Sequence, residues 1–242
     1  MSTADEGAPA AGGAEAGQTA GARLRPFPVR VGQVFFSPGV LTDSLARNPA
    51  WAAAVLLGAA LVVLQIALIP PDVWDAMFRE VMLRRGQAMP KGFNAGGTLM
   101  RVSTLGFGTL GYFLMTFLFA GLVTLVFAFV MGDEGRYGQY LAVVGHAWLI
   151  PTIVGLLLVP LKIFQQDPQL TLNLGTFMYF LPEGYLARAA KLLDLSQAWA
   201  WLVVAQGAHA IEPRRSFESG AIVLMVVFVI VAMLFALIPG AA

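Results

Sequence analysis

Long apolar runs separated by short polar segments dominate the chain from residue 50 onward. About 20 residues, each rising about 1.5 Å, suffice for a helix to cross the roughly 30 Å hydrocarbon core of a bilayer. Five runs approach or exceed this length and predict transmembrane helices over residues 50–69, 105–131, 140–161, 195–211 and 219–238. The run over 195–211 is the shortest and most polar of the five. The expected fold class is all-α, a polytopic membrane helical bundle.

Prolines and capping residues indicate where these helices begin, bend and end. Asn48-Pro49 is typical of a helix start and precedes the first run, which ends before Pro70. Pro151 lies inside the run over 140–161, where it removes a backbone donor and predicts a kink. Asp194, three residues before Gln197, resembles a capping box that opens the fourth run.

Shorter segments carry an amphipathic pattern, apolar on one helical face and polar on the other. Residues 38–47 and 72–85 are expected to form helices along the membrane surface. The apolar face of the second consists of Trp74, Met77, Phe78, Val81 and Met82, which recur at helical spacing. Glycines and Pro90 then predict an irregular loop up to Arg101, and a further short helix is expected over 185–193.

The first 26 residues differ in composition from the rest of the chain. They are rich in Ala and Gly and hold too few apolar residues to offset the entropy lost on ordering, so this segment is expected to be a disordered tail. It also lacks the apolar core of a secretory signal peptide. Residues 27–242 are expected to form a single membrane domain.

Composition narrows the function classes. Hydrophobic residues make up 58% of the chain and charged residues 12%, whereas a soluble domain has roughly 45–50% and about 25%, so a water-soluble globule is excluded. A net charge of +1 with no basic stripe argues against a nucleic-acid partner. The absence of cysteine excludes disulfides and thiolate metal sites, and two histidines leave little for other metals. No metal or cofactor is expected.

Charged residues lie outside the apolar runs, in the tail, the connectors and the ends of the runs. With five crossings, seven of the fifteen Lys and Arg residues fall on the N-terminal side of the membrane and eight on the other. The positive-inside rule therefore does not decide the orientation.

Three polar residues inside the runs form the candidate intramembrane site: His146, Gln65 and Gln206. One interpretation is structural, with each side chain hydrogen-bonded to a neighbouring helix or to a carbonyl freed by Pro151. The other is a polar path through a small transporter or channel, with His146 as a proton relay. No run contains an Asp or Glu in its interior that could act as a proton partner, so the structural interpretation is favoured.

The polar turn of Asp133, Glu134 and Arg136 is a candidate contact for a protein partner, and the alternative is a solvated turn. The glycines of residues 106–111 do not form a phosphate-binding loop, because no Lys with Ser or Thr follows them. No arrangement of nucleophile and base, or of paired carboxylates, is recognisable. The sequence gives no reason to expect an enzyme.

Several motifs together suggest a family. They are Phe36-Ser37-Pro38, Asn48-Pro49-Ala50-Trp51, the small-residue segment over 140–151 that ends in Pro, and Leu193-Asp194-Leu195 followed by Trp199 and Gly207. With five clustered apolar helices after a polar N-terminal region, the chain resembles the bacterial branch of the Yip (Ypt/Rab-interacting protein) family over about residues 34–238.

The resemblance implies a non-enzymatic integral membrane protein that acts through partners, with its N-terminus in the cytosol and its C-terminus on the opposite side. Eukaryotic members are tied to Rab GTPases and vesicle traffic, a role that does not carry over automatically to a bacterial-type sequence. The expected location is the bacterial inner membrane.

Three functions stay open at this point. The favoured one is a scaffold or assembly partner for other membrane proteins, with a homo-oligomer as one form. A small transporter or channel is the second. The third is a bilayer-remodelling or curvature-sensing protein that uses the amphipathic segments 38–47 and 72–85.

Overall fold

The computed structural model describes residues 24–84, 86–88, 92, 94, 97–178, 180–182 and 184–238. Within them every regular element is a helix, apart from one isolated β-bridge between Asn173 and Asp194. The elements are α2 (Phe27–Phe36), α3 (Pro38–Arg47), α4 (Ala52–Leu68), α5 (Pro71–Arg84), α6 (Thr98–Thr124), the π-helix η1 (Leu125–Val130), α7 (Tyr137–Ala147), α8 (Leu149–Leu157), α9 (Val159–Phe164), the 3-10 helix η2 (Leu174–Thr176), α10 (Tyr185–Leu192), α11 (Leu195–Ile211) and α12 (Phe217–Phe235). The predicted disordered tail lies, up to residue 23, outside the described residues.

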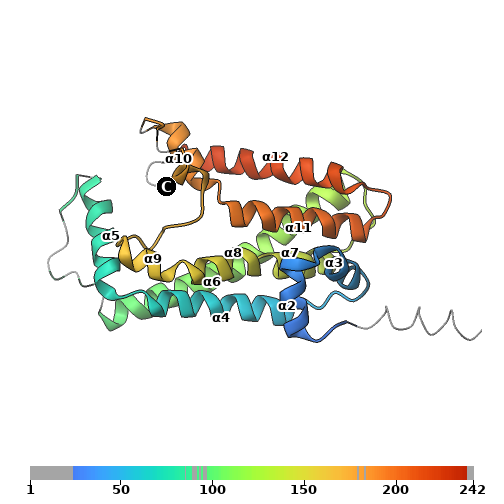
Figure 1. The fold of residues 1–242 in the computed structure, drawn as a ribbon, viewed down its shortest axis with the longest axis horizontal. Helices are drawn as coiled ribbons and strands as arrows, with labels where there is room; N and C mark the ends of the chain where they lie inside the picture. Colours follow the sequence, from blue (N-terminus) through green and yellow to red (C-terminus); the bar gives the residue numbers. More distant parts are fainter. Residues whose placement is uncertain are drawn as a thin grey trace, which may run out of the picture.

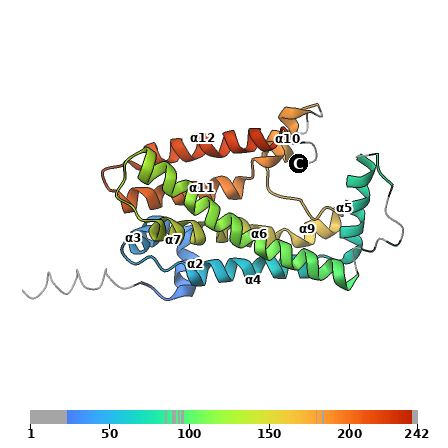
Figure 2. The ribbon, with the colours of Figure 1, turned by 180° about the vertical axis from the view of Figure 1, so that it is seen from behind.

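Five helical segments run side by side along the long axis of the molecule: α4, α6 with η1, the α7–α9 series, α11 and α12 (Figures 1 and 2). Helices α2 and α3 lie at one end of this bundle, and α5, α10 and the end of α12 lie at the other (Figure 1). The described chain therefore enters and leaves the bundle at opposite ends. The prediction of an all-α membrane bundle is confirmed.

Not all five segments are long enough to cross a membrane as single straight helices. Among the described residues three qualify by length and apolar composition, Thr98–Val130, Tyr137–Leu157 and Phe217–Phe235, and α4 joined to α5 through an 87° bend would be a fourth. Helices α4 and α11 have 17 residues each, which at 1.5 Å per residue is about 26 Å. The count of five membrane crossings stays a prediction.

The predicted start of the second run is wrong by seven residues, because α6 begins at Thr98 rather than at 105. The extended backbone of Gly97 precedes it, and its carbonyl accepts the backbone N–H of Arg101 at 3.0 Å. No Gly or Pro lies between Thr98 and Leu105, so nothing interrupts helical hydrogen bonding there. Residues 98–101, predicted to be loop, are helical.

The kink predicted at Pro151 is confirmed, and a second break follows it. Helix α7 ends at Ala147, four residues before Pro151, where the proline ring conflicts with the preceding turn. A similar break at Leu158 precedes Pro160, which sits in the first turn of α9. The series continues to Phe164, three residues beyond the predicted end of this run.

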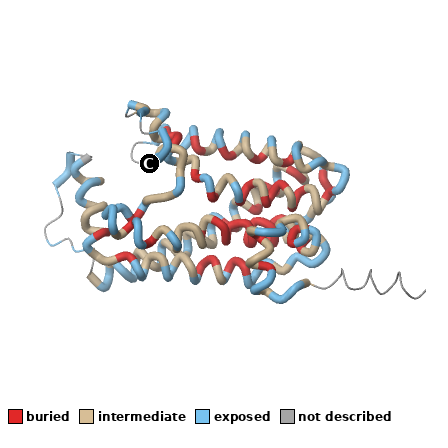
Figure 3. Tube along the Cα trace, in the orientation of Figure 1, coloured by how far each residue is buried: buried red, intermediate tan, exposed pale blue. Residues whose placement is uncertain are grey.

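The buried residues gather on α7, α8 and α11, in the centre of the bundle (Figure 3). In the α7–α8 segment 61% of the most apolar stretch is buried, against 22% in both α6–η1 and α12. Four aromatic side chains fill the centre: Trp148 and Trp201 meet edge to face at 5.3 Å between ring centroids, Phe119 lies 5.2 Å from Trp148, and Phe228 lies 6.5 Å from Trp201. The α7–α8 segment is the core, and α6 and α12 are peripheral.

Close packing at this core depends on small residues. A Cβ atom on Gly207 would lie 2.3 Å from Val143 Cγ1, and one on Gly108 would lie 2.6 Å from Ile66 Cδ1. Both distances are far below van der Waals contact, so glycine is required where α11 meets α7 and where α6 meets α4.

Candidate functional site

His146, the titratable residue singled out from the sequence, is fully buried on α7. Its Nδ1 lies 2.8 Å from the carbonyl oxygen of Ala142, one turn earlier, so this nitrogen carries the proton and donates it. Its Nε2 lies 3.1 Å from Nη1 of Arg30, and because a guanidinium can only donate, Nε2 is the acceptor. His146 is therefore a neutral imidazole that joins α7 to α2.

Arg30 was missed as a functional candidate from the sequence, where it counted only as a charge outside the apolar runs. It lies on α2 and is 7% exposed. Its Nη1 also donates to the carbonyl of Ala50 at 3.3 Å, its guanidinium lies 5.1 Å from the centroid of the Phe27 ring, and its Nε is buried with no partner among the described residues. Burial lowers the pKa of Arg30.

Helix α2 was itself not expected, although Pro28 in its first turn is typical of a helix start. Arg30 and Val34, four residues apart, are its buried positions. This spacing is the signal that could have indicated a helix with one face against the bundle.

Gln65 and Gln206 also contact neighbouring helices, as the structural interpretation predicts for such residues. Gln65 on α4 donates from Nε2 to the carbonyl of Thr152 on α8 at 3.0 Å, and a Cβ on Gly155 would lie 2.6 Å from its Oε1. Gln206 on α11 lies beside Gly39 of α3, where a Cβ would be 3.6 Å from its Nε2.

The structure does not bring His146, Gln65 and Gln206 together. A Cβ on Gly145 would lie 2.9 Å from Val55, so His146 stands near the level of Val55 on α4. Gln65 is ten residues further along that helix, about 15 Å away. The three polar side chains bridge three different pairs of helices: α2 with α7, α4 with α8, and α3 with α11.

The acidic turn after η1 is occupied by contacts within the chain. Asp133 is buried, and its carboxylate accepts from Nε of Arg215 at 2.8 Å (Oδ2) and from Nη2 of Arg215 (Oδ1). The guanidinium of Arg215 also lies 5.4 Å from the centroid of the Phe127 ring, and the bonds to Asp133 raise the pKa of Arg215. The interpretation of a solvated turn is wrong for Asp133, because the carboxylate joins this turn to the α11–α12 connector.

The other two residues of this turn are exposed. Glu134 pairs with Arg214 at 3.1 Å, and Arg214 also donates to Glu212 at 2.9 Å, which lowers the pKa of Glu212. Arg136 precedes α7 and its backbone N–H donates to Oε1 of Gln139 at 2.8 Å. A contact of this turn with another protein stays a prediction for Glu134 and Arg136.

The interfacial helix predicted over 72–85 is α5, at Pro71–Arg84. All five residues of its predicted apolar face are half-buried, while Asp72, Arg79 and Glu80 are exposed, which confirms the amphipathic pattern. The fully buried residue of α5 is Val73, which packs with Ile69 and Val159.

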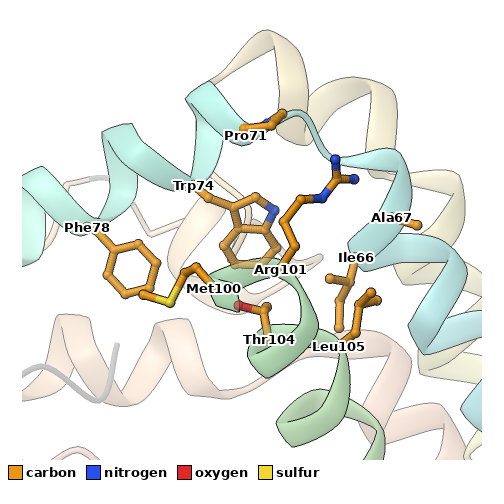
Figure 4. A pocket seen from close by; sticks show the side chains of 9 residues that line it. All are labelled: Ile66, Ala67, Pro71, Trp74, Phe78, Met100, Arg101, Thr104 and Leu105. Atoms are coloured by element: carbon orange, nitrogen blue, oxygen red, sulfur yellow. The ribbon is translucent and has the colours of Figure 1, made fainter. Parts of the chain in front are cut away.

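A shallow groove lies where the α4–α5 bend meets the start of α6 (Figure 4). Its walls are Ile66, Ala67, Pro71, Trp74, Phe78, Met100, Arg101, Thr104 and Leu105, and its volume is about 20 Å³. Within the described part of the chain, no three His, Cys, Asp or Glu side chains gather as they would around a metal ion.

Comparison with known protein families gives one match, to the Yip1 domain over residues 32–238. No curated protein and no solved structure matches the chain. The matched range begins inside α2 and includes every later helix of the bundle, together with His146, the Asp133 turn and the groove beside α5. The chain therefore belongs to the Yip1-domain family and is a multi-pass helical membrane protein of the Yip type.

Proposed function

We propose that this protein is a non-enzymatic membrane scaffold that holds other membrane proteins through the outer faces of its peripheral helices. Membership of the Yip1-domain family supports a membrane protein that acts through partners. The finer role rests on the contrast between the core and the periphery of the bundle.

The observation that carries the proposal is the exposed apolar surface of α6–η1. Phe107, Phe129 and Leu99 on this segment are 75%, 77% and 82% exposed, and each is a large apolar side chain. Without a hydrophobic driving force inside the bilayer, helices associate through close packing of such faces with those of neighbouring helices. Helix α12 offers a second face of this kind, with Ile222 64% exposed.

The interior of the bundle favours association over transport. Aromatic rings fill its centre, and the polar side chains of the apolar helices are bonded to neighbouring helices at separate levels. A solute path would have to pass between Trp148, Trp201 and Phe119. These groups hold the helices together, which is what a scaffold requires.

The proposed location is the bacterial inner membrane with the α2–α3 end of the bundle in the cytosol. Resemblance to the bacterial branch of the Yip family supports this orientation. Reporter fusions before α2 and after α12 test it, since the described chain enters and leaves the bundle at opposite ends (Figure 1).

Site-specific photo-crosslinking in living cells tests the scaffold. A photoreactive phenylalanine analogue replaces Phe107 or Phe129 on the exposed face, and Phe228, which is 6% exposed, is the matched internal control. We expect discrete protein adducts at the two exposed positions and none at the control. An adduct with a second copy of the chain identifies a homo-oligomer, which is one form of the scaffold. Adducts with lipid alone at Phe107, Phe129 and Ile222 would overturn the proposal.

A further inference from the structure

The groove between α5 and α6 combines apolar walls with an uncompensated cation. Ile66, Phe78 and Leu105 line it, and Arg101 projects into it from the first turn of α6 (Figure 4). Arg101 is exposed and forms no hydrogen bond or ion pair with the described residues. Charge complementarity at this groove therefore requires an anion.

A second donor faces the same space. Figure 4 shows the indole nitrogen of Trp74 on the side of the ring that faces the Arg101 side chain. An indole N–H only donates, and a guanidinium offers donors in a planar fork that matches two phosphate oxygens. No carboxylate is among the nine lining residues. The chemistry of the groove fits a phosphate group.

The position of the groove indicates where that phosphate comes from. Helix α5 leaves α4 at 87°, so when α4 crosses the bilayer α5 lies along its surface. The groove sits in the corner between them, at the depth where lipid headgroups meet the hydrocarbon core. Tryptophan is enriched at this depth, and so are arginines at the ends of membrane helices.

The size of the groove excludes an enclosed small molecule. A volume of about 20 Å³ is close to the space of a single water, whereas pockets for small ligands measure about 300–1,000 Å³. A phospholipid does not need an enclosed pocket, because its headgroup stays in water and its chains lie against the outside of the bundle. We propose that this groove binds one phospholipid, with its phosphodiester on Arg101 and Trp74 and the first part of an acyl chain against Ile66, Leu105 and Phe78.

The test compares two arginines close in sequence to the groove. Wild type, Arg101→Gln and Arg79→Gln are purified in mild detergent, and bound phospholipid is counted by native mass spectrometry. Arg79 is exposed on the polar face of α5 and is absent from the groove lining, so it is the matched control. The expected result is at least a threefold loss of bound phospholipid in Arg101→Gln and no change in Arg79→Gln. Equal retention in all three proteins would overturn the proposal.

Two further arms keep the outcome interpretable. Arg101→Lys keeps the charge but loses the planar fork, and is expected to retain less lipid than wild type and more than Arg101→Gln. If Arg101→Gln does not fold, a wild-type level of lipid on a folded Arg101→Lys together with a wild-type level on Trp74→Phe contradicts the assignment. Millimolar inorganic phosphate is added to the wild type as a competitor. Complete displacement of the lipid signal by inorganic phosphate would show a free-anion site and overturn the lipid assignment.

Discussion

Two buried arginines, Arg215 and Arg30, sit in similar surroundings but have different partners. Each guanidinium lies over a phenylalanine ring, at 5.4 Å from Phe127 and at 5.1 Å from Phe27. Arg215 donates to both oxygens of the buried carboxylate of Asp133. Arg30 donates only to neutral acceptors, the imidazole of His146 and a backbone carbonyl.

The difference separates what closes the bundle from what is attached to it. The Asp133–Arg215 pair joins the turn after η1 to the α11–α12 connector, so opposite charges connect two helical hairpins at one end of the molecule. Arg30 attaches α2, which lies outside the five parallel segments (Figure 1). We infer that the first contact is essential to the fold, whereas the second holds α2 with a smaller and adjustable free energy.

The largest expected effect comes from breaking the first pair. Asp133→Asn leaves the buried cation of Arg215 without a counter-charge, and removing one partner of a buried pair typically costs about 3–5 kcal/mol. The depression beside the pair opens to water, so the lower value, about 3 kcal/mol, is expected for the free energy of unfolding in detergent. Glu134→Gln, which breaks an exposed pair in the same turn, is the control and should cost less than about 1 kcal/mol.

The second prediction concerns Arg30→Met. Because no carboxylate balances this cation, its removal also removes an uncompensated charge, and the expected cost is about 1 kcal/mol, the value of a single hydrogen bond. The free energy of unfolding and amide hydrogen exchange in α2 report it, with the exposed Arg25→Met as control. A loss for Arg30→Met as large as that for Asp133→Asn would remove the distinction between the two arginines.

Acid sharpens the same comparison. Nε2 of His146 accepts from Arg30, and a protonated imidazole would instead point an N–H at a guanidinium cation. The other titratable groups on the helices around it are Tyr137 and Tyr140 on α7, Tyr112 and Arg101 on α6, His209 on α11, and Asp43 and Arg47 on α3; α4 and α8 carry none. Hydrogen exchange in α2 should therefore be faster at about pH 5 than at about pH 7.5 in wild type, and much less pH-dependent in Arg30→Met. Equal pH dependence in the two proteins would count against the contact.

The smallest expected effect lies at Glu212. Its pKa is held below the usual value by Arg214, so the pair adds stability above the usual pKa of a glutamate, and this contribution is lost as the pH falls through the lowered pKa. The difference in unfolding midpoint between wild type and Arg214→Gln should be small at neutral pH, because Arg214 is 78% exposed, and should vanish in acid. A difference that grows in acid would have the wrong sign.

Local patterns in the sequence predicted much of the fold. Helices α3, α5 and α10 were predicted to within a residue at each end, because amphipathic spacing and capping residues are local signals. Asp194 caps α11 as expected, accepting the backbone N–H groups of Ser196 and Gln197. The start of α6 was not predicted, because the glycines before it mask an uninterrupted helical stretch.

The candidate site was less predictable, since its contacts join distant parts of the chain. Arg30 and His146 are 116 residues apart, and Asp133 and Arg215 are 82 apart. A charged residue outside the apolar runs gives no local signal that it will fold back into the bundle. His146 could be singled out from the sequence, but the arginine that bonds to it could not.

The central claim is that the polar groups inside this bundle hold its helices together and carry nothing across the membrane. The most direct measurement is proton flux into liposomes that contain the purified protein, as wild type and as His146→Ala, under an imposed pH gradient. The account predicts no flux above protein-free vesicles in either case. Flux through the wild type that disappears in a folded His146→Ala protein would contradict it.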